Sequence, residues 1–219
     1  SVAGAEQFKK VKAIVEADPD RQIIVVSAAG KRDREDHKIT DLLYLCNAHQ
    51  IYGVSCEDIL QVIEERFAGI RNELGLSLDI EGEFAALRDK LDRGMSVDEL
   101  VSRGEYFTAR LMAEFLGRPF VDAMECIHFG MDGQVDRERT YEAVAAVYGR
   151  TGPFVLPGFY GRIPTGRAKL MPRGGGDITG ALAAAAVNAD VYENWTDVSG
   201  ILMADPRIVK DPKPIAEMT

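Results

Sequence analysis

The sequence is poor in cysteine, with only Cys46, Cys56 and Cys126 among its 219 residues. An odd number of cysteines does not make a disulfide framework, and their spacing matches no metal-binding motif. We therefore expect reduced thiols, no zinc site and no metal site built from protein ligands.

Long apolar runs are also absent, since none approaches the ~20 residues that a helix needs to cross a bilayer. The stretch from Ser1 to Ala5 lacks the basic start and apolar core of a secretory signal. With 46% hydrophobic and 28% charged residues, the composition is that of an ordinary soluble protein. These features predict a cytoplasmic protein with no membrane partner.

Positive charge is in deficit, because 26 lysines and arginines face 35 aspartates and glutamates, for a formal net charge of -9. This balance argues against general binding of nucleic acid. An anionic substrate would need locally placed basic side chains, Mg2+ or helix termini to overcome the field of the protein. Basic residues beside glycines therefore gain weight as candidates for a binding site.

Apolar runs alternate with helical patterns along most of the chain, which predicts an α/β fold. We expect a three-layer α/β/α sandwich with a mostly parallel sheet, and a helical lobe at about residues 56–118. The whole chain, 1–219, is predicted to be one catalytic domain, with a nucleotide-binding part at about 150–219. The predicted strands cover residues 23–26, 120–123, 154–157 and 191–195, and the predicted helices include 5–17, one capped by Thr40 or Asp41, and 138–147.

The segment from Arg173 to Thr179 is the strongest candidate for an anion site. Three glycines lead into a helix of small residues, and a helix start carries unpaired N–H donors and partial positive charge. Arg173 can grip a carboxylate or phosphate with two donors, and Asp177 adds a carboxylate beside it. The glycines match neither the phosphate loop nor the dinucleotide fingerprint, and a purely structural turn is the alternative.

Two further groups stand near predicted element ends. Glu105 lies near the start of a predicted helix, where a glutamate is usually a solvated capping residue, although it could partner a substrate ammonium group. Thr196 and Asp197 follow the predicted strand 191–195, at the edge where α/β sheets bind ligands, unless they form an ordinary turn.

These motifs together resemble the amino acid kinase family, and within it the aspartate kinases. The resemblance covers nearly the whole chain. The matching pieces, in family order, are Val25 to Ala28 with Thr40 and Asp41, Ser102 to Glu105, Pro157 to Phe159, Arg173 to Asp177, and Trp195 to Val198 with Asp205 to Arg207.

The resemblance implies transfer of a phosphoryl group from ATP, with Mg2+, to the side-chain carboxylate of L-aspartate, the first step toward lysine, threonine and methionine. It implies that Arg173 holds a substrate carboxylate, that Glu105 holds the ammonium group, and that Asp177 organises the reacting centre. It also implies a homo-oligomer, expected to be a dimer. The aspartate pocket would further include Ser27, Thr40, Gly174 and Gly175, and the nucleotide would contact Thr196, Asp197, Leu202, Asp205 and Arg207.

The sequence departs from the family pattern at several points. Gly176 stands where a serine is usual, and Leu202 stands where a tyrosine commonly contacts adenine. The family begins with a Lys-Phe-Gly-Gly segment whose lysine neutralises phosphate charge, and it continues into regulatory domains. We expect a chain that begins after this lysine and stops before those domains to be a truncated catalytic region with poor turnover.

Other functions stay open at this stage. A sister kinase could act on glutamate or on an N-acetylated amino acid, although Glu105 favours a free ammonium group. The chain could also be a non-catalytic sensor of amino acids or nucleotides. An NAD-linked protein is disfavoured because no dinucleotide fingerprint follows any predicted strand.

Overall fold

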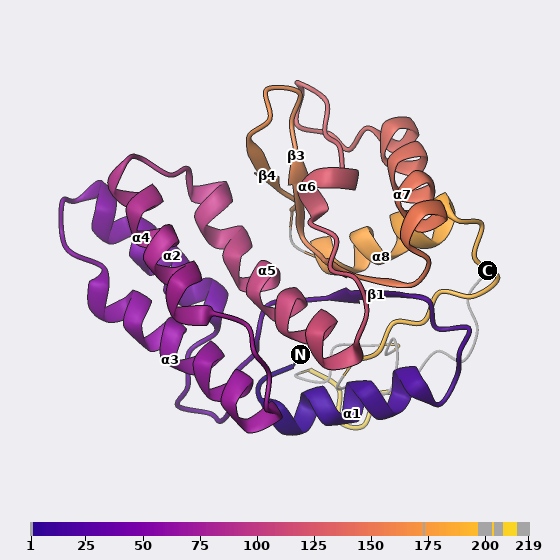
Figure 1. Ribbon diagram of the computed structural model, residues 1–219, viewed down its shortest axis with the longest axis horizontal. Helices are drawn as coiled ribbons and strands as arrows, with labels where there is room; N and C mark the ends of the chain where they lie inside the picture. The colour runs from indigo at the N-terminus through magenta and orange to yellow at the C-terminus, as the bar shows by residue number, and fades with distance from the viewer. Residues whose placement is uncertain (1, 173, 197–202, 204–207, 214–219) are drawn as a thin grey trace.

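The computed structural model of the protein describes residues 2–172, 174–196, 203 and 208–213. Figure 1 shows β1 near the centre, with α1 on one side of it and α7 and α8 on the other, while α2, α3 and α4 gather at one end. The helices are α1 (Ala5–Glu16), α2 (Ile39–Ile51), α3 (Glu57–Leu74), α4 (Ile80–Asp92), α5 (Val97–Leu116), α6 (Ala123–Cys126), α7 (Arg137–Thr151) and α8 (Gly175–Ala186). The strands are β1 (Ile23–Val26), β2 (Phe154–Pro157), β3 (Tyr160–Arg162) and β4 (Ala168–Leu170).

Strands β1 and β2 are parallel neighbours, with Ile23 opposite Phe154 and Val26 opposite Pro157. Their side chains alternate between two hydrophobic cores, because successive residues of a strand point to opposite faces. Val26 and Val155 belong to the core that contains α1, α3 and α5. Phe154 and Leu156 belong to the core that contains α7 and α8. Both faces are thus covered, which explains the uninterrupted apolar runs and confirms the three-layer α/β fold.

Three long helices, α3, α4 and α5, occupy the region where the sequence predicted helices. The Ser96 side chain caps α5 by accepting a hydrogen bond from the Glu99 backbone N–H at 3.2 Å. Stacked rings of Phe84 and Phe107, with centroids 4.7 Å apart, join α4 to α5. Helix α5 also contacts β1 and β2, so it carries its side chains from the helical end of the molecule to the sheet.

Two of the predicted strands are wrong. In the segment 120–123, only Phe120 forms a bridge, to Val155, and α6 starts at Ala123 because the Asp122 side chain caps it. The segment 191–195 has no strand structure. Its apolar residues do not enter the core, since Val191 is 71% exposed and Trp195 is 62% exposed.

The predicted cap of α2 is also wrong. The helix begins at Ile39, two residues earlier than a Thr40 cap requires, and Lys38 occupies the N-cap position without a side-chain hydrogen bond. Ile39, the first residue of the helix, is fully buried. Among the described residues, no helix is both long and apolar enough to cross a membrane.

Candidate active site

The carboxyl ends of β1 and β2 lie side by side against the start of α8. Ser27 follows β1, and Gly158 follows β2 and donates its backbone N–H to the Val26 carbonyl at 2.9 Å. A Cβ atom on Gly158 would lie 3.0 Å from the Cα of Gly176, and one on Gly176 would lie 3.2 Å from the Ser27 hydroxyl oxygen. Glycine at these positions therefore lets the first turn of α8 approach the strand ends closely.

The first turn of α8 presents backbone N–H groups beside this edge. Its N-cap is Gly174, which has no side chain to occupy the free donors. The first N–H groups of a helix have no partner within the helix, and together with the helix dipole they favour a bound anion. The chain thus places anion-binding chemistry next to Ser27.

Thr179 fixes the contact between α8 and the turn after β2. Phe159 has a left-handed backbone conformation, with φ of 77°, which is uncommon for a bulky residue. Its N–H donates to the Thr179 hydroxyl oxygen at 3.1 Å, and that hydroxyl donates to the Gly175 carbonyl at 2.8 Å. Thr179 is fully buried, so these two bonds satisfy a polar group that water does not reach.

Glu105 lies in the middle of α5, which corrects the prediction that it stands near a helix start. The helix begins at Val97, after the Ser96 cap, and Gly104 does not interrupt it. Gly104 instead permits a close approach, because a Cβ atom there would lie 2.9 Å from the Cβ of Ala28 and 3.2 Å from Ile39 Cγ2. Glu105 is consequently only 5% exposed, which excludes a solvated capping role.

The carboxyl group of Glu105 is incompletely satisfied. Burial raises its pKa to about 7, and hydrogen bonding from the backbone of Ala28 and of Glu105 itself lowers the pKa only in part. Its Oε2 atom is buried without a hydrogen-bond partner among the described residues. A buried acceptor of this kind is costly unless a ligand supplies a donor.

The start of α2 packs against α5 beside Glu105. Thr40 is half-buried and follows Ile39, whose side chain lies against Gly104. Tyr44, one helical turn after Thr40, lies close enough to Asp98 and Glu105 for their charges to add to burial in raising the pKa of its phenol. Sequence reasoning missed Tyr44, although its spacing of four residues from Thr40 places both on one helix face.

Asp177 is exposed on the first turn of α8 and meets the segment before Thr196. Its carboxylate accepts a hydrogen bond from the Asn194 side-chain amide at 3.3 Å. Its carbonyl accepts one from the Tyr192 hydroxyl, also at 3.3 Å. The structure therefore brings residues 192–194 to the start of α8, and Thr196 is exposed at the end of this segment.

The structure brings Ser27, Gly175 and Gly176 together at the strand ends, and the backbone of Ala28 links Ser27 to Glu105. Other predicted site residues fall outside the described residues. These are Arg173, Asp197, Leu202, Asp205 and Arg207.

A separate cavity of about 560 Å³ lies between α7 and the β3–β4 hairpin and includes His128, Arg139 and Arg162 in its lining. Burial, together with the charge of Arg162, lowers the pKa of His128. None of the predicted site residues that the structure describes lines this cavity.

The sequence profile of the amino acid kinase family matches residues 1–219. Aspartokinase 3 of Bacillus subtilis is 33% identical over all of this chain and 51% of its own length. The crystal structure of Clostridium acetobutylicum aspartate kinase has a TM-score of 0.91 and 46% identity, and the match covers 97% of this chain and 49% of that one.

A structure of Escherichia coli aspartokinase III in complex with aspartate and ADP has a TM-score of 0.81 at 27% identity, covering 98% of this chain and 51% of that one. The chain therefore spans about half the length of the relatives it matches.

Proposed function

Because this chain belongs to the amino acid kinase family, we propose that it is the catalytic region of an aspartate kinase. In the proposed reaction, a side-chain carboxylate oxygen of L-aspartate attacks the γ-phosphorus of ATP. The bond between that phosphorus and the oxygen bridging to the β-phosphate breaks, and ADP leaves with the electron pair. The products are ADP and 4-phospho-L-aspartate.

The buried carboxyl of Glu105 is the single observation that best supports this substrate. An α-ammonium group would supply the donor that the Oε2 atom of Glu105 lacks. It would also favour the ionised carboxylate against the burial that now raises its pKa. Ser27 and Thr40 would complete the amino-acid pocket. An N-acetylated substrate lacks this charge, so Glu105 favours a free amino acid.

The start of α8 would hold the reacting anions. Transfer between a carboxylate and a triphosphate brings negative charges together, so catalysis depends on positioning and on surrounding positive charge. The backbone N–H groups of Gly175 and Gly176 supply part of that charge, and we assign Arg173 to grip a substrate carboxylate. Asp177 would organise the reacting centre.

We assign the nucleotide to the part of the chain at about 150–219, with its contacts at Thr196, Asp197, Leu202, Asp205 and Arg207. The E. coli relative was crystallised with aspartate and ADP, which supports nucleotide use by this fold. Mg2+ would come with ATP and neutralise phosphate charge. Among the described residues there is no cluster of three His, Cys, Asp or Glu side chains for a metal. In the proposed complex, Mg2+ would be held mainly by the phosphates of ATP, with Asp177 as the nearby carboxylate.

The test is coupled ADP release by the full-length protein with a panel of amino acids. We expect release with L-aspartate and much less with L-glutamate or N-acetyl-aspartate. A preference for either of the latter would assign a sister kinase. Binding of aspartate and nucleotide without ADP release would instead indicate a sensor. We also propose a cytoplasmic homodimer; light scattering of the purified protein tests the dimer, and fractionation of the source cells tests the compartment.

The two ligand sites can be separated by substitution. Glu105→Ala is expected to raise mainly the KM for aspartate, because it removes the acceptor for the ammonium group. Asp197→Ala is expected to raise mainly the KM for ATP. Equal effects of both substitutions on both KM values would contradict this division.

A further inference from the structure

The loop of residues 31–38 joins two parts of the proposed aspartate pocket. It begins after Gly30, three residues beyond Ser27, and ends at Lys38, two residues before Thr40. The loop therefore connects the strand end that carries Ser27 to the helix start that carries Thr40. Seven of its eight residues are lysine, arginine, aspartate or glutamate, and such a loop would ordinarily be solvated.

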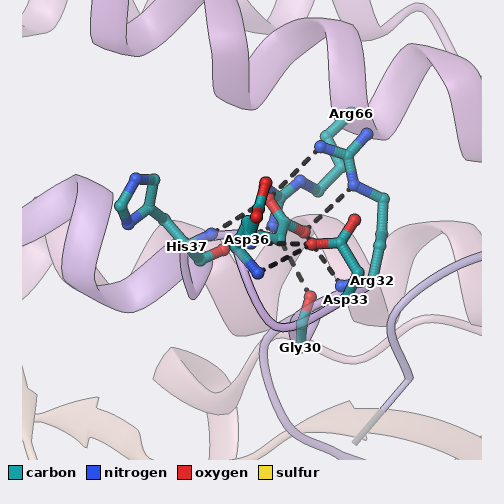
Figure 2. Close-up of polar contacts among 7 residues, drawn as sticks. Gly30, Arg32, Asp33, Asp36, His37 and Arg66 are labelled. Carbon is teal, nitrogen blue, oxygen red and sulfur yellow. Dashed lines mark hydrogen bonds and ion pairs between the residues drawn. The ribbon is translucent and has the colours of Figure 1, made fainter.

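Arg66 of α3 reaches this loop at both ends (Figure 2). Its Nη1 donates to the His37 carbonyl at 2.8 Å and, at the long limit of 3.5 Å, to the Gly30 carbonyl. Its Nη2 forms an ion pair with the Asp36 carboxylate. The His37 imidazole lies outside this cluster, so only its backbone takes part.

Asp36 connects the interior of the loop to Arg66, because its carboxylate binds both Arg66 and Arg32. Its carboxylate accepts hydrogen bonds from the Arg32 backbone N–H at 2.9 Å and from Arg32 Nε at 3.0 Å. These bonds from Arg32 lower the pKa of Asp36 strongly against the opposing effect of burial, and the charge of Arg66 lowers it further. Asp33 adds a turn by accepting the backbone N–H groups of Glu35 and Asp36.

The ion pair between Arg66 and Asp36 is buried, with side chains only 2% and 6% exposed. Burial lowers the pKa of Arg66 by disfavouring its charged form, and its Nε has no partner among the described residues. A buried ion pair commonly gains no stability over apolar residues of similar size, because desolvation opposes the attraction. The planar guanidinium group of Arg66, with its N–H donors in fixed directions, instead holds Gly30, Asp36 and His37 in a defined geometry.

We propose that Arg66 is a positioning residue, which through Asp36 and the loop backbone holds Thr40 at the working distance from Ser27 in the aspartate pocket. The inference rests on the proposed function. Arg66 is not one of the residues assigned to either ligand, so in this proposal it acts through the loop on the affinity for aspartate and on the alignment of its carboxylate. The nucleotide, assigned to a different part of the chain, is not affected.

Steady-state kinetics of Arg66→Met in the full-length protein test this role. We expect the KM for aspartate to rise roughly tenfold to a hundredfold, because displacement of contacts by about 1 Å has effects of this size. The KM for ATP should stay within about twofold. Arg66→Lys, which keeps the charge but not the planar set of donors, should restore part of the affinity for aspartate.

Arg71→Met is the matched control. Arg71 lies on the same helix, pairs with Glu81 and donates to the Leu78 carbonyl at 3.3 Å, but it does not contact the loop. The Arg71→Met substitution should leave the KM for aspartate and the KM for ATP unchanged. The double variant Arg66→Met with Asp36→Asn should resemble the single variants, because both changes break one connection.

The outcomes separate the two proposals. If the wild type shows no aspartate-dependent ADP release, the proposed function fails and this inference fails with it. If the wild type is active and folded Arg66→Met keeps its KM for aspartate, or raises both KM values equally, only the positioning role is overturned. Should Arg66→Met not fold, Asp36→Asn gives the same decision, since it keeps the shape of the side chain.

Discussion

Replacing Glu105 with glutamine should change how the stability of the protein depends on pH. Burial raises the pKa of Glu105 from 4.5 to about 7 in the folded state. Between these values the folded state binds more protons than the unfolded state, so the free energy of unfolding falls as pH rises. The contribution of protonated Glu105 to the free energy of unfolding is complete below pH 4.5, and it is lost as the pH rises through about 7.

The size of this loss follows from the two pKa values. Each unit of difference between the two pKa values corresponds to about 1.4 kcal/mol. The free energy of unfolding of the wild type should therefore fall by about 3 kcal/mol relative to that of Glu105→Gln across this pH range. That is a large part of a net stability of about 5–15 kcal/mol. Glutamine does not ionise, so the variant lacks this loss whatever its absolute stability.

Urea unfolding of both proteins at several pH values between 4.5 and 8.5 measures the difference. Glu114→Gln is the control on the same helix. There burial is outweighed by hydrogen bonds from Ser77 and the Leu78 backbone, so the pKa of Glu114 is lowered. Its contribution is therefore present above its unfolded pKa and lost as pH falls. Parallel pH profiles for wild type and Glu105→Gln would refute the burial argument.

Two further substitutions and one ligand effect test the packing around the site. Gly104→Ala should destabilise the protein by about 1–3 kcal/mol and weaken aspartate binding, because its Cβ would overlap Ala28; unchanged thermal unfolding would contradict this close contact. Thr179→Val should lower the free energy of unfolding by about 1–3 kcal/mol, since it leaves the Phe159 N–H without its acceptor; a neutral effect in urea unfolding would show that this bond is dispensable. Saturating L-aspartate should raise the Tm of the wild type more at pH 8 than at pH 6, because only ionised Glu105 attracts the ammonium group; an equal rise at both pH values would argue against that contact.

The parts of the fold that the sequence predicted well are those where burial dictates residue type. The apolar runs of β1 and β2 are strands because both faces are covered. The apolar run 191–195 failed as a strand because its side chains are exposed, and composition does not say whether a core is present to receive them. Similarly, Phe120 pairs with Val155 while the Asp122 cap diverts the next residues into α6.

The sequence identified residues of the candidate site, but it did not predict their burial or their tertiary contacts. The sequence placed Glu105 near a helix start, whereas it lies in the middle of α5. Gly104 in fact serves a tertiary contact with Ala28, which one sequence does not show. Arg66 left one readable signal, since it shares the buried stripe of α3 with Ile63 and Ile70. Its partner Asp36 is thirty positions away and could not be identified from the helix pattern.

Trapping of the product with hydroxylamine tests the central claim most directly. An acyl phosphate reacts with hydroxylamine to give a hydroxamate, whereas other phosphorylated products do not. With ATP, Mg2+ and L-aspartate, the full-length protein should form aspartyl hydroxamate in step with ADP. Formation of ADP without the hydroxamate, or no dependence on aspartate, would contradict phosphorylation of the aspartate side chain.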